Sequence, residues 1–463
     1  QMSLSNAMNI ARNSLDDTQK RMSIVSRNLS GASDVNYSNR TMTTHLRNDG
    51  SCYTTIRRDA DDGLLADYLT KRSRASGASI FYNGASQLND IFGASEFAHS
   101  PTEALAKFKQ SMQTYISQSD KKSTSQAVIS NAQNLANSLN FAAKEIQKLR
   151  KDTDAEVTEE VKDVNKLLQQ LKEIEGHIVH NDSEDVYSYM DQRDAVLKEL
   201  SGHVSITFTK HDDGSVAVYA ANGITLFDKE PREVTFNATQ LKPGEPGGVI
   251  KIDGVPLTHS SFVSPNGDGT LGNLLKFRDE TCVQYQNQLD LIAANLVGLF
   301  NGKKDKNVKG LDLFQVDSVT GPGMAGTIHV NPKYITGAKG GDSTLLGDSK
   351  NLQKIIDDMS KTDQFDYGNY TSEKLGLHGG HSLLSFAKES LSWVGSLVKN
   401  SKEDNEYKVT MFNHAEQVLS NQTGVNKDDE LAMMVEIEQS YGASAKLISA
   451  VGKMMDDLLA AIR

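Results

Sequence analysis

The chain opens on LSNAMNIARNSLDDTQKRMSIVSRNLSGA, residues 4–32, in which apolar side chains recur at alternating spacings of four and three. This spacing places one apolar seam along an amphipathic helix, as in a coiled coil. Thr18 is the one polar member before the seam ends near Ala32. The remaining seam residues, which we expect to form an interface, are Leu4, Met8, Ala11, Leu15, Met22, Val25 and Leu29.

The last stretch of the chain, residues 427–463, repeats the pattern with Ser444 as its one polar seam member. Asn426 is placed to cap this helix, and the acidic residues 428–430 suit the positive end of its dipole. Because an isolated helix of this length is marginal in water, we expect the two terminal helices to pair with each other. The second seam consists of Met434, Ile437, Tyr441, Ile448, Val451, Met455, Leu458 and Ile462.

Charge and additional apolar residues indicate how the two terminal helices are oriented and whether they have further neighbours. Residues 2–47 carry six Lys/Arg and three Asp/Glu, whereas residues 427–463 carry four and seven, so opposite net charges are expected to set the orientation of the pair. Apolar side chains also flank both seams, which makes each face wider than a two-helix contact needs and indicates further neighbours. The flanking residues are Ala7, Ile24, Leu447, Met454 and Leu459.

The composition of the whole chain excludes several partners. Its 463 residues carry a formal charge of −11, which disfavours binding to nucleic acid or to an anionic membrane. No apolar run approaches 18 residues, and residues 3–19 lack the pattern of a signal peptide, so we expect neither membrane insertion nor ordinary secretion to be encoded there. Cys52 and Cys282 form no crosslinking or zinc-binding framework, and we expect two reduced, inert thiols, with Cys282 on a buried helical stripe.

The fold class expected from these patterns is mainly α with a small β insertion, arranged as an elongated multi-domain rod whose terminal helices pair as a coiled coil. Helical spacing indicates helices at 61–97, one or two helices at 101–150 and a helical pair at 155–200. Alternating segments with Asp-Gly and Asn-Gly turns then indicate an antiparallel β domain. The expected units are an axial helix at 2–35, a helical-bundle domain in two parts at 36–202 and 269–426 with a loop-rich stretch at 302–348, the β domain at 203–268, and a second axial helix at 427–463.

Three motifs invite a chemical interpretation. Gly267–Gly272 reads GDGTLG and fits GxGxxG, with Asp290 near the place of a ribose-binding acid, but no βαβ unit surrounds it. The loop beginning at Asn266 has Phe277 where a calcium loop needs Glu. The pairs His177/His180 and His378/His381 lack further ligands and are interpreted as surface histidines. We expect no metal, no cofactor and no catalytic residue.

Residues 26–40, SRNLSGASDVNYSNR, follow the first helix and are similar to the "iSnNiAnanTpGYsRq" signature of the axial flagellar proteins. DQRDAVLKELS at 191–201, GDGTLGNLLKFRD at 267–279 and the terminal helix follow in the order typical of the hook-associated branch of that family. The resemblance covers the chain from end to end. Arg27, Ser30-Gly31 and Asn36 depart from the signature, and Asn36 would keep the turn because Asn tolerates left-handed backbone angles.

The resemblance implies a non-enzymatic structural subunit of the bacterial flagellum at the junction between hook and filament. Its implied partners are further copies in a helical layer, the hook protein and the second junction protein, which is the third hook-associated protein. It further implies export through the flagellar type III apparatus to an extracellular site, a β domain on the outer surface, and terminal helices that become ordered on docking. An export chaperone would shield the C-terminal helix through Ile437, Tyr441, Leu447, Ile448, Val451, Met455 and Leu458.

Two alternatives stay open at the level of sequence. One is another axial subunit, either the third hook-associated protein or a flagellin-like protein, against which the DQRD stretch and the β insertion argue. The other is a nucleotide-dependent enzyme that uses GDGTLG. A nucleotide-dependent shift in melting temperature separates the second alternative from a structural subunit.

Overall fold

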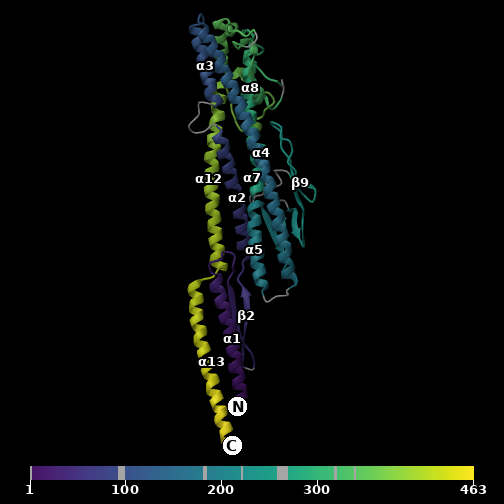
Figure 1. The fold of residues 1–463 in the computed structure, drawn as a ribbon, viewed down its shortest axis with the longest axis vertical. Helices are drawn as coiled ribbons and strands as arrows, with labels where there is room; N and C mark the ends of the chain where they lie inside the picture. Colours follow the sequence, from purple (N-terminus) through teal and green to yellow (C-terminus); the bar gives the residue numbers. More distant parts are fainter. Residues whose placement is uncertain are drawn as a thin grey trace.

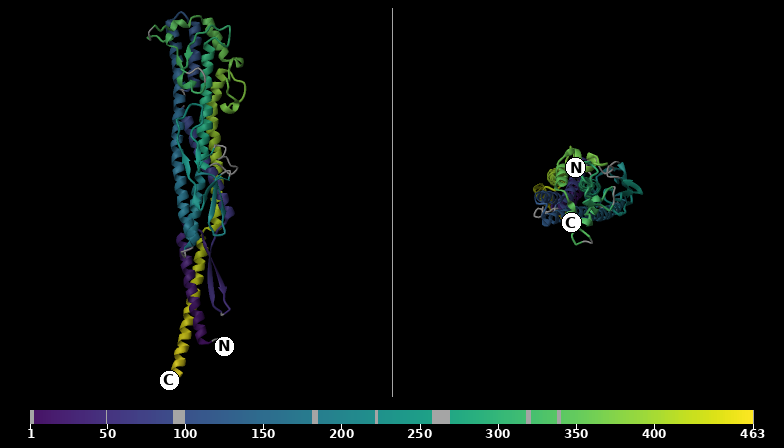
Figure 2. Two further views of the ribbon diagram at one scale, coloured as in Figure 1. Left: turned by 90° about the vertical axis from the view of Figure 1, so that its right-hand side faces the viewer. Right: turned by 90° about the horizontal axis from the view of Figure 1, so that it is seen from above.

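The computed structural model describes residues 3–48, 50–91, 100–180, 185–220, 223–257, 269–317, 321–337 and 340–462. The protein is a long rod of helices with small antiparallel sheets, and both ends of the chain lie at the same end of the rod (Figure 1). The view turned by 90° shows the same elongation (Figure 2). The expected fold class, mainly α with a small β insertion and paired terminal helices, is therefore confirmed.

The end of the rod that holds both termini is built from two helices and one hairpin. Helix α1 (Leu4–Gly31) packs along α13 (Lys427–Ile462), and the hairpin of β1 (Arg40–Leu46) and β2 (Cys52–Arg58) lies against α1. The sequence pattern predicted a helical-bundle domain at 36–202, so these strands were not predicted. Their sequences, RTMTTHL and CYTTIRR, are rich in Thr, which favours a strand over a helix.

The middle of the rod is a bundle in which α2 (Asp62–Asp90) and α12 (Leu383–Thr423) run side by side, with α5 (Val186–His203) and α7 (Gly269–Lys276) against them. Helix α4 (Lys122–His180) is continuous for 59 residues, whereas the sequence predicted a break between 150 and 155. The apolar pattern is interrupted there because Arg150, Thr153 and Asp154 are buried polar residues, and each makes hydrogen bonds that let the helix continue.

The far end of the rod contains α3 (Pro101–Ser117), a π-helical turn η3 (Phe277–Thr281) and α8 (Cys282–Phe300). The rings of Phe108, Phe300 and Phe314 meet in its core at centroid distances of 5.4–5.7 Å. Short elements complete this end: β10 (Phe314–Gln315), α9 (Met324–Thr327), β11 (His329–Val330), η4 (Pro332–Tyr334), η5 (Ser343–Leu346), α10 (Ser349–Met359), η6 (Thr362–Gln364) and α11 (Ser372–Leu375).

The β insertion forms two small antiparallel sheets beside α4. The first has the strand order β3-β4-β5-β6 and the second β7-β8-β9. The strands are β3 (Ile206–Lys210), β4 (Val216–Ala220), β5 (Thr225–Asp228), β6 (Glu230–Pro231), β7 (Val234–Phe236), β8 (Ile250–Ile252) and β9 (Val255–Leu257).

Two buried arginines attach the second sheet to the helices. Arg150 of α4 donates to the carbonyl oxygens of Lys242 and Glu245, and Arg278 of η3 donates to the carbonyl of Gly248 at 2.8 Å. Arg278 also pairs with Asp154 at 2.7 Å. The Gly- and Pro-rich stretch at 242–248 is thus a loop held against the helical core by charge-assisted hydrogen bonds.

Candidate assembly surface at the paired termini

The contact between α1 and α13 is an apolar seam. Ala11 and Val25 of α1 are buried, as are Ile437 and Val451 of α13. Burying such side chains contributes about 25 cal/mol per Å² of apolar surface removed from water. The two helices therefore pair through part of each predicted seam.

Hydrogen bonds fix the direction and the ends of the pair. The hydroxyls of Ser14 and Ser444 lie 3.3 Å apart, and Lys427 Nζ lies 3.4 Å from Ser33 Oγ, so the helices run antiparallel. Asn426 Oδ1 accepts from the backbone amide of Asp428 at 3.1 Å, which confirms Asn426 as the cap of α13.

The structure separates the predicted interface residues into covered and uncovered groups. On α1 all of them are buried or half-buried: Leu4, Met8, Ala11, Leu15, Met22, Val25 and Leu29. On α13, Ile437 and Val451 are buried and Met434 and Ile448 half-buried. The side chain of Ile462 lies outside the described residues. The predicted residues that α1 leaves exposed are Tyr441, Leu447, Met455 and Leu458.

One face of α13 is exposed to solvent between residues 443 and 458. Ala443, Leu447, Ala450, Met454 and Leu458 recur at spacings of three and four and are all exposed; Leu447 and Met454 are each 50% exposed. We call these five residues the outer stripe. They lie beside the seam that contacts α1, so the apolar surface of α13 exceeds what one partner helix covers.

The opposite net charges of the terminal helices do not meet in a direct ion pair within the described part of the chain, so their effect on orientation stays a prediction. Among the described residues, no ion pair joins α1 to α13. Arg27 of α1 instead lies 3.6 Å from Asp185, in front of α5. Within the chain, the apolar seam and the serine contact join the two helices.

The turn after α1 is locked by an aromatic ring. Tyr37 donates from its hydroxyl to Asn28 Oδ1 at 2.8 Å, and its ring lies where a Cβ on Gly31 would come within 2.5 Å. The turn closes through Asp34, whose carboxylate accepts from the amide of Asn36 at 2.9 Å. The turn is kept with Asn36 in place, as expected, although Asn36 does not adopt a left-handed conformation.

The DQRD stretch forms an ionic joint beneath the hairpin, with Asp191 at its centre. Its carboxylate accepts from Ser38 Oγ at 2.5 Å, from Arg40 at 2.9 Å and from Arg58 at 2.7 Å. Arg58 also pairs with Asp194. Burial alone lowers the pKa of the Arg58 guanidinium, but the charges of Asp194 and Asp191 raise it above its ordinary value. We call these five residues the axial joint.

Two more residues of α5 extend the attachment. Arg193 donates to the carbonyl of Gly214 at 3.0 Å, and Tyr187 donates from its hydroxyl to the carbonyl of Ile56 at 3.1 Å. At the end of α12, the Thr423 carbonyl accepts from the amide of Asn39 at 2.8 Å. One short motif therefore connects the axial end, the helical bundle and the first sheet. The DQRD motif is typical of the family in sequence, but the sequence does not reveal this structural role.

A buried carboxylate lies where α13 begins. Glu430 is 5% exposed, and its Oε2 has no hydrogen-bond partner. Burial raises the pKa of Glu430, and a hydrogen bond with Asn28 offsets part of this effect. An ionised Glu430 is consequently unfavourable at this position.

The described part of the glycine-rich motif and Asp290 make contacts within the fold. Gly267 and the loop at Asn266 lie outside the described residues, and Gly269 begins α7 with its carbonyl bonded to Asn273. Asp290 is 1% exposed and accepts from the backbone amides of Gly323 and Ala325, so it holds the chain around these residues in place. Burial raises the pKa of its carboxyl group.

One histidine of each pair, His177 and His381, contacts other side chains of the fold. His177 stacks on Tyr189 at 4.4 Å. The interpretation of His381 as a surface residue is wrong, because it is 2% exposed and bonds Tyr367 and Glu389 through its two ring nitrogens. In the part of the chain that the structure describes, no cluster of three metal-ligating side chains occurs, and no helix is long and apolar enough to cross a membrane.

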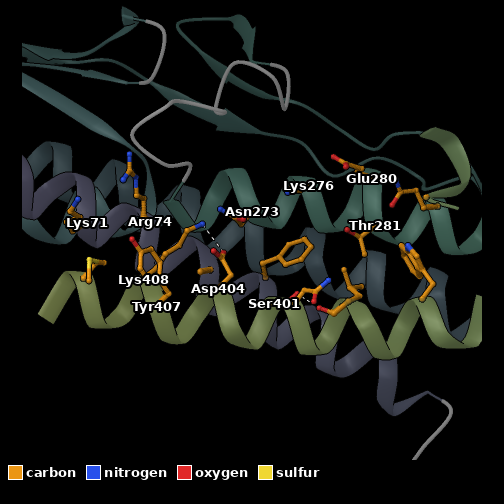
Figure 3. A pocket seen from close by; sticks show the side chains of 18 residues that line it. Lys71, Arg74, Asn273, Lys276, Glu280, Thr281, Ser401, Asp404, Tyr407 and Lys408 are labelled. Carbon is orange, nitrogen blue, oxygen red and sulfur yellow. Dashed lines mark hydrogen bonds and ion pairs between the residues drawn. The ribbon is translucent and has the colours of Figure 1, made fainter. Parts of the chain in front are cut away.

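A groove with a volume of about 690 Å³ lies between α2, α7 and α12 (Figure 3). Phe81 and Trp393 line its apolar part. Two of its cations have partners within the fold, since Lys408 pairs with Asp404 at 2.9 Å and Lys276 lies over the Phe81 ring.

Comparisons with known proteins match two stretches of the chain to flagellar family models. Residues 85–315 match the family model described as flagellar hook-associated protein FlgK helical domain. Residues 417–461 match the model described as flagellar basal body rod FlgEFG protein C-terminal.

Named relatives agree with these models. The chain is 22% identical to flagellar hook-associated protein 1 of Salmonella typhimurium, over 68% of this chain and 60% of that protein. It is 20% identical to flagellar hook-associated protein 1 of Bacillus subtilis, over 77% of this chain and 75% of that protein. A solved structure of the flagellar hook junction protein FlgK from Burkholderia pseudomallei shares 23% identity and a TM-score of 0.46, over 56% of this chain and 47% of that one. The chain thus spans about 60% of the length of the Salmonella relative.

Proposed function

The chain belongs to the flagellar hook-associated proteins among the axial flagellar proteins, and from this premise we propose that it is a structural subunit at the junction between hook and filament. The observation that carries the proposal is the outer stripe of α13, an apolar face that remains exposed after α1 and α13 have paired. A helix that keeps such a face uncovered in the monomer is suited to contact further subunits. Head-to-tail contacts of this kind generate helical layers.

The proposed partners are further copies of the chain, the hook protein and the third hook-associated protein. Before assembly, an export chaperone would cover the C-terminal helix from Ile437 to Leu458 during passage through the flagellar type III apparatus. The terminal helices would gain their final order on docking, when burial of about 1,000 Å² of apolar surface per end offsets the loss of conformational freedom. The proposed location is the extracellular flagellum, and the proposed role involves no catalysis.

The axial joint supports a mechanical role. Its charges couple the axial helices to the bundle through hydrogen bonds from Arg40, Arg58 and Ser38 to one carboxylate. Buried charge networks have strict geometry, so they hold one orientation between two parts better than an apolar contact does. This suits a subunit that joins two different lattices.

A matched pair of variants tests the proposal in cells that lack their own junction protein. Leu447→Asp with Met454→Asp changes exposed residues only, so the folded monomer is expected to persist while filament attachment and motility are lost. The control, Lys251→Glu with Lys303→Glu, changes exposed residues elsewhere and should leave motility intact. Normal filaments from the Leu447/Met454 variant would refute the proposed role of the stripe.

A further inference from the structure

The hairpin β1–β2 has one face against α1 and one face turned away from it. Thr54 Oγ1 donates to Asp17 of α1 at 2.9 Å, which identifies the inner face. Side chains alternate between faces along a strand, so the neighbouring cross-strand pair His45 and Tyr53 belongs to the outer face. Tyr53 is 39% exposed there.

The outer face is a preformed aromatic and cationic platform. The rings of His45 and Tyr53 stack at 5.0 Å, and the Arg47 guanidinium lies 5.0 Å from the centroid of the Tyr53 ring. Arg57 is exposed on the same face. We call His45, Arg47, Tyr53 and Arg57 the hairpin platform. Tyr and Arg held in place by their neighbours are the residue types that most often anchor protein interfaces.

The platform is basic on a chain whose net charge is −11. The described residues of β1 and β2 include no carboxylate, and neither Arg47 nor Arg57 forms an ion pair with any described residue. Its natural complement is therefore a surface that combines carboxylates with an apolar strip.

Helix α13 presents such a surface at the same end of the rod. Glu436 lies seven residues before Ala443 and Asp457 seven residues after Ala450, so both carboxylates share the face of the outer stripe. Both are exposed, and neither forms an ion pair with a described residue. The outer stripe thus carries an acidic residue towards each end.

We propose that the hairpin platform of one copy docks on the outer stripe of α13 of a second copy. Tyr53 lies on the apolar residues of the stripe, and the arginines face its exposed carboxylates. Within one copy, α1 lies between α13 and β2 (Figure 1), so the two surfaces serve different neighbours. A contact between two different patches of identical chains is heterologous, and its repetition produces an open helical layer. This inference rests on the proposed junction role. It adds the hairpin platform as a second contact surface of the subunit, beside the outer stripe.

Photo-crosslinking in flagella tests this contact directly. In cells that make the full chain, Tyr53 is replaced by p-benzoylphenylalanine, the flagella are purified and irradiated, and crosslinked peptides are identified by mass spectrometry. The expected product is a covalent dimer whose second chain is linked within 427–463. The matched control places the same photoreactive residue at Tyr407, which is exposed on α12, and should give no crosslink to this helix.

Charge reversal tests the electrostatic part. Arg47→Glu with Arg57→Glu should lower the dimer yield by about fivefold or more, since like charges then face each other. Adding Glu436→Arg and Asp457→Arg in the same chain should restore the yield. The pair Lys251→Glu and Lys303→Glu, with the same change in net charge, should leave it unchanged.

The outcomes separate the inference from the proposed function. Crosslinks from Tyr53 to another protein, or to a different segment of a second copy, overturn the docking inference while the junction role stands. Absence of the chain from purified flagella overturns both. Unaltered dimer yield after reversal of both arginines overturns the assignment of the platform as the contact.

Discussion

Ser38 and Asp191 lie 153 positions apart, yet the Ser38 hydroxyl donates to Asp191 Oδ1 at 2.5 Å and its amide donates to Oδ2 at 3.2 Å. The same carboxylate accepts from Arg40 and Arg58. The axial end of the rod is therefore joined to the bundle by one buried acid that accepts four hydrogen bonds from three residues.

Asp191→Asn is expected to destabilise the protein by about 3–5 kcal/mol, because it leaves buried arginines without their main counter-charge. Urea unfolding followed by circular dichroism measures the change, and hydrogen exchange should show that the hairpin amides lose protection first. The control is Asp185→Asn, which breaks an exposed pair with Arg27 and should cost less than about 1 kcal/mol. Equal effects of the two substitutions would contradict the central place of Asp191.

Gly31→Ala is expected to destabilise the axial turn by about 1–3 kcal/mol, because the added Cβ collides with the ring of Tyr37. Gly395→Ala is the matched control within α12, where a Cβ meets no atom within 4 Å. Removing a helical glycine there should stabilise the protein by about 0.5–1 kcal/mol. Opposite signs for the two changes, measured by thermal unfolding, are the predicted result.

Glu430→Gln is expected to stabilise the protein at pH 7. Burial raises the pKa of Glu430 above its ordinary value of 4.5, so the folded chain holds this proton more tightly than the unfolded chain. Its contribution to stability therefore falls as pH rises from 4.5 through the raised folded pKa. Unfolding at pH 4 and pH 7 should show a gain for the variant at pH 7 only. The exposed Glu403→Gln should show no such difference, and a loss of stability at pH 7 for Glu430→Gln would contradict the interpretation.

The two thiols should react at very different rates. Burial raises the pKa of Cys282 to about 12, and the side chain has no exposed surface, whereas Cys52 in β2 is half-exposed. A disulfide reagent added to the folded protein should modify one thiol quickly and the second only on unfolding. Cys52→Ser should remove the fast phase; persistence of that phase would place the accessible thiol elsewhere.

The sequence predicted the helices better than the strands near the N-terminus. The hairpin was not predicted because its two strands are short, although the Thr-rich segments RTMTTHL and CYTTIRR favour strands. The continuity of α4 was missed for another reason. Arg150 and Asp154 interrupt the apolar pattern of the helix, which in sequence indicates a break. Their buried partners lie about 90–130 residues away in the chain, so local spacing does not reveal them.

The sequence by itself determined the paired terminal helices, the cap at Asn426 and the buried stripe that contains Cys282, because helical periodicity and capping depend on residues within a few turns. Only the tertiary structure decided that Asp191 holds Ser38, Arg40 and Arg58, and that α1 leaves the outer stripe of α13 uncovered. These features depend on contacts between segments distant in the chain, and local spacing carries no information about which distant surface will cover a face or satisfy a charge.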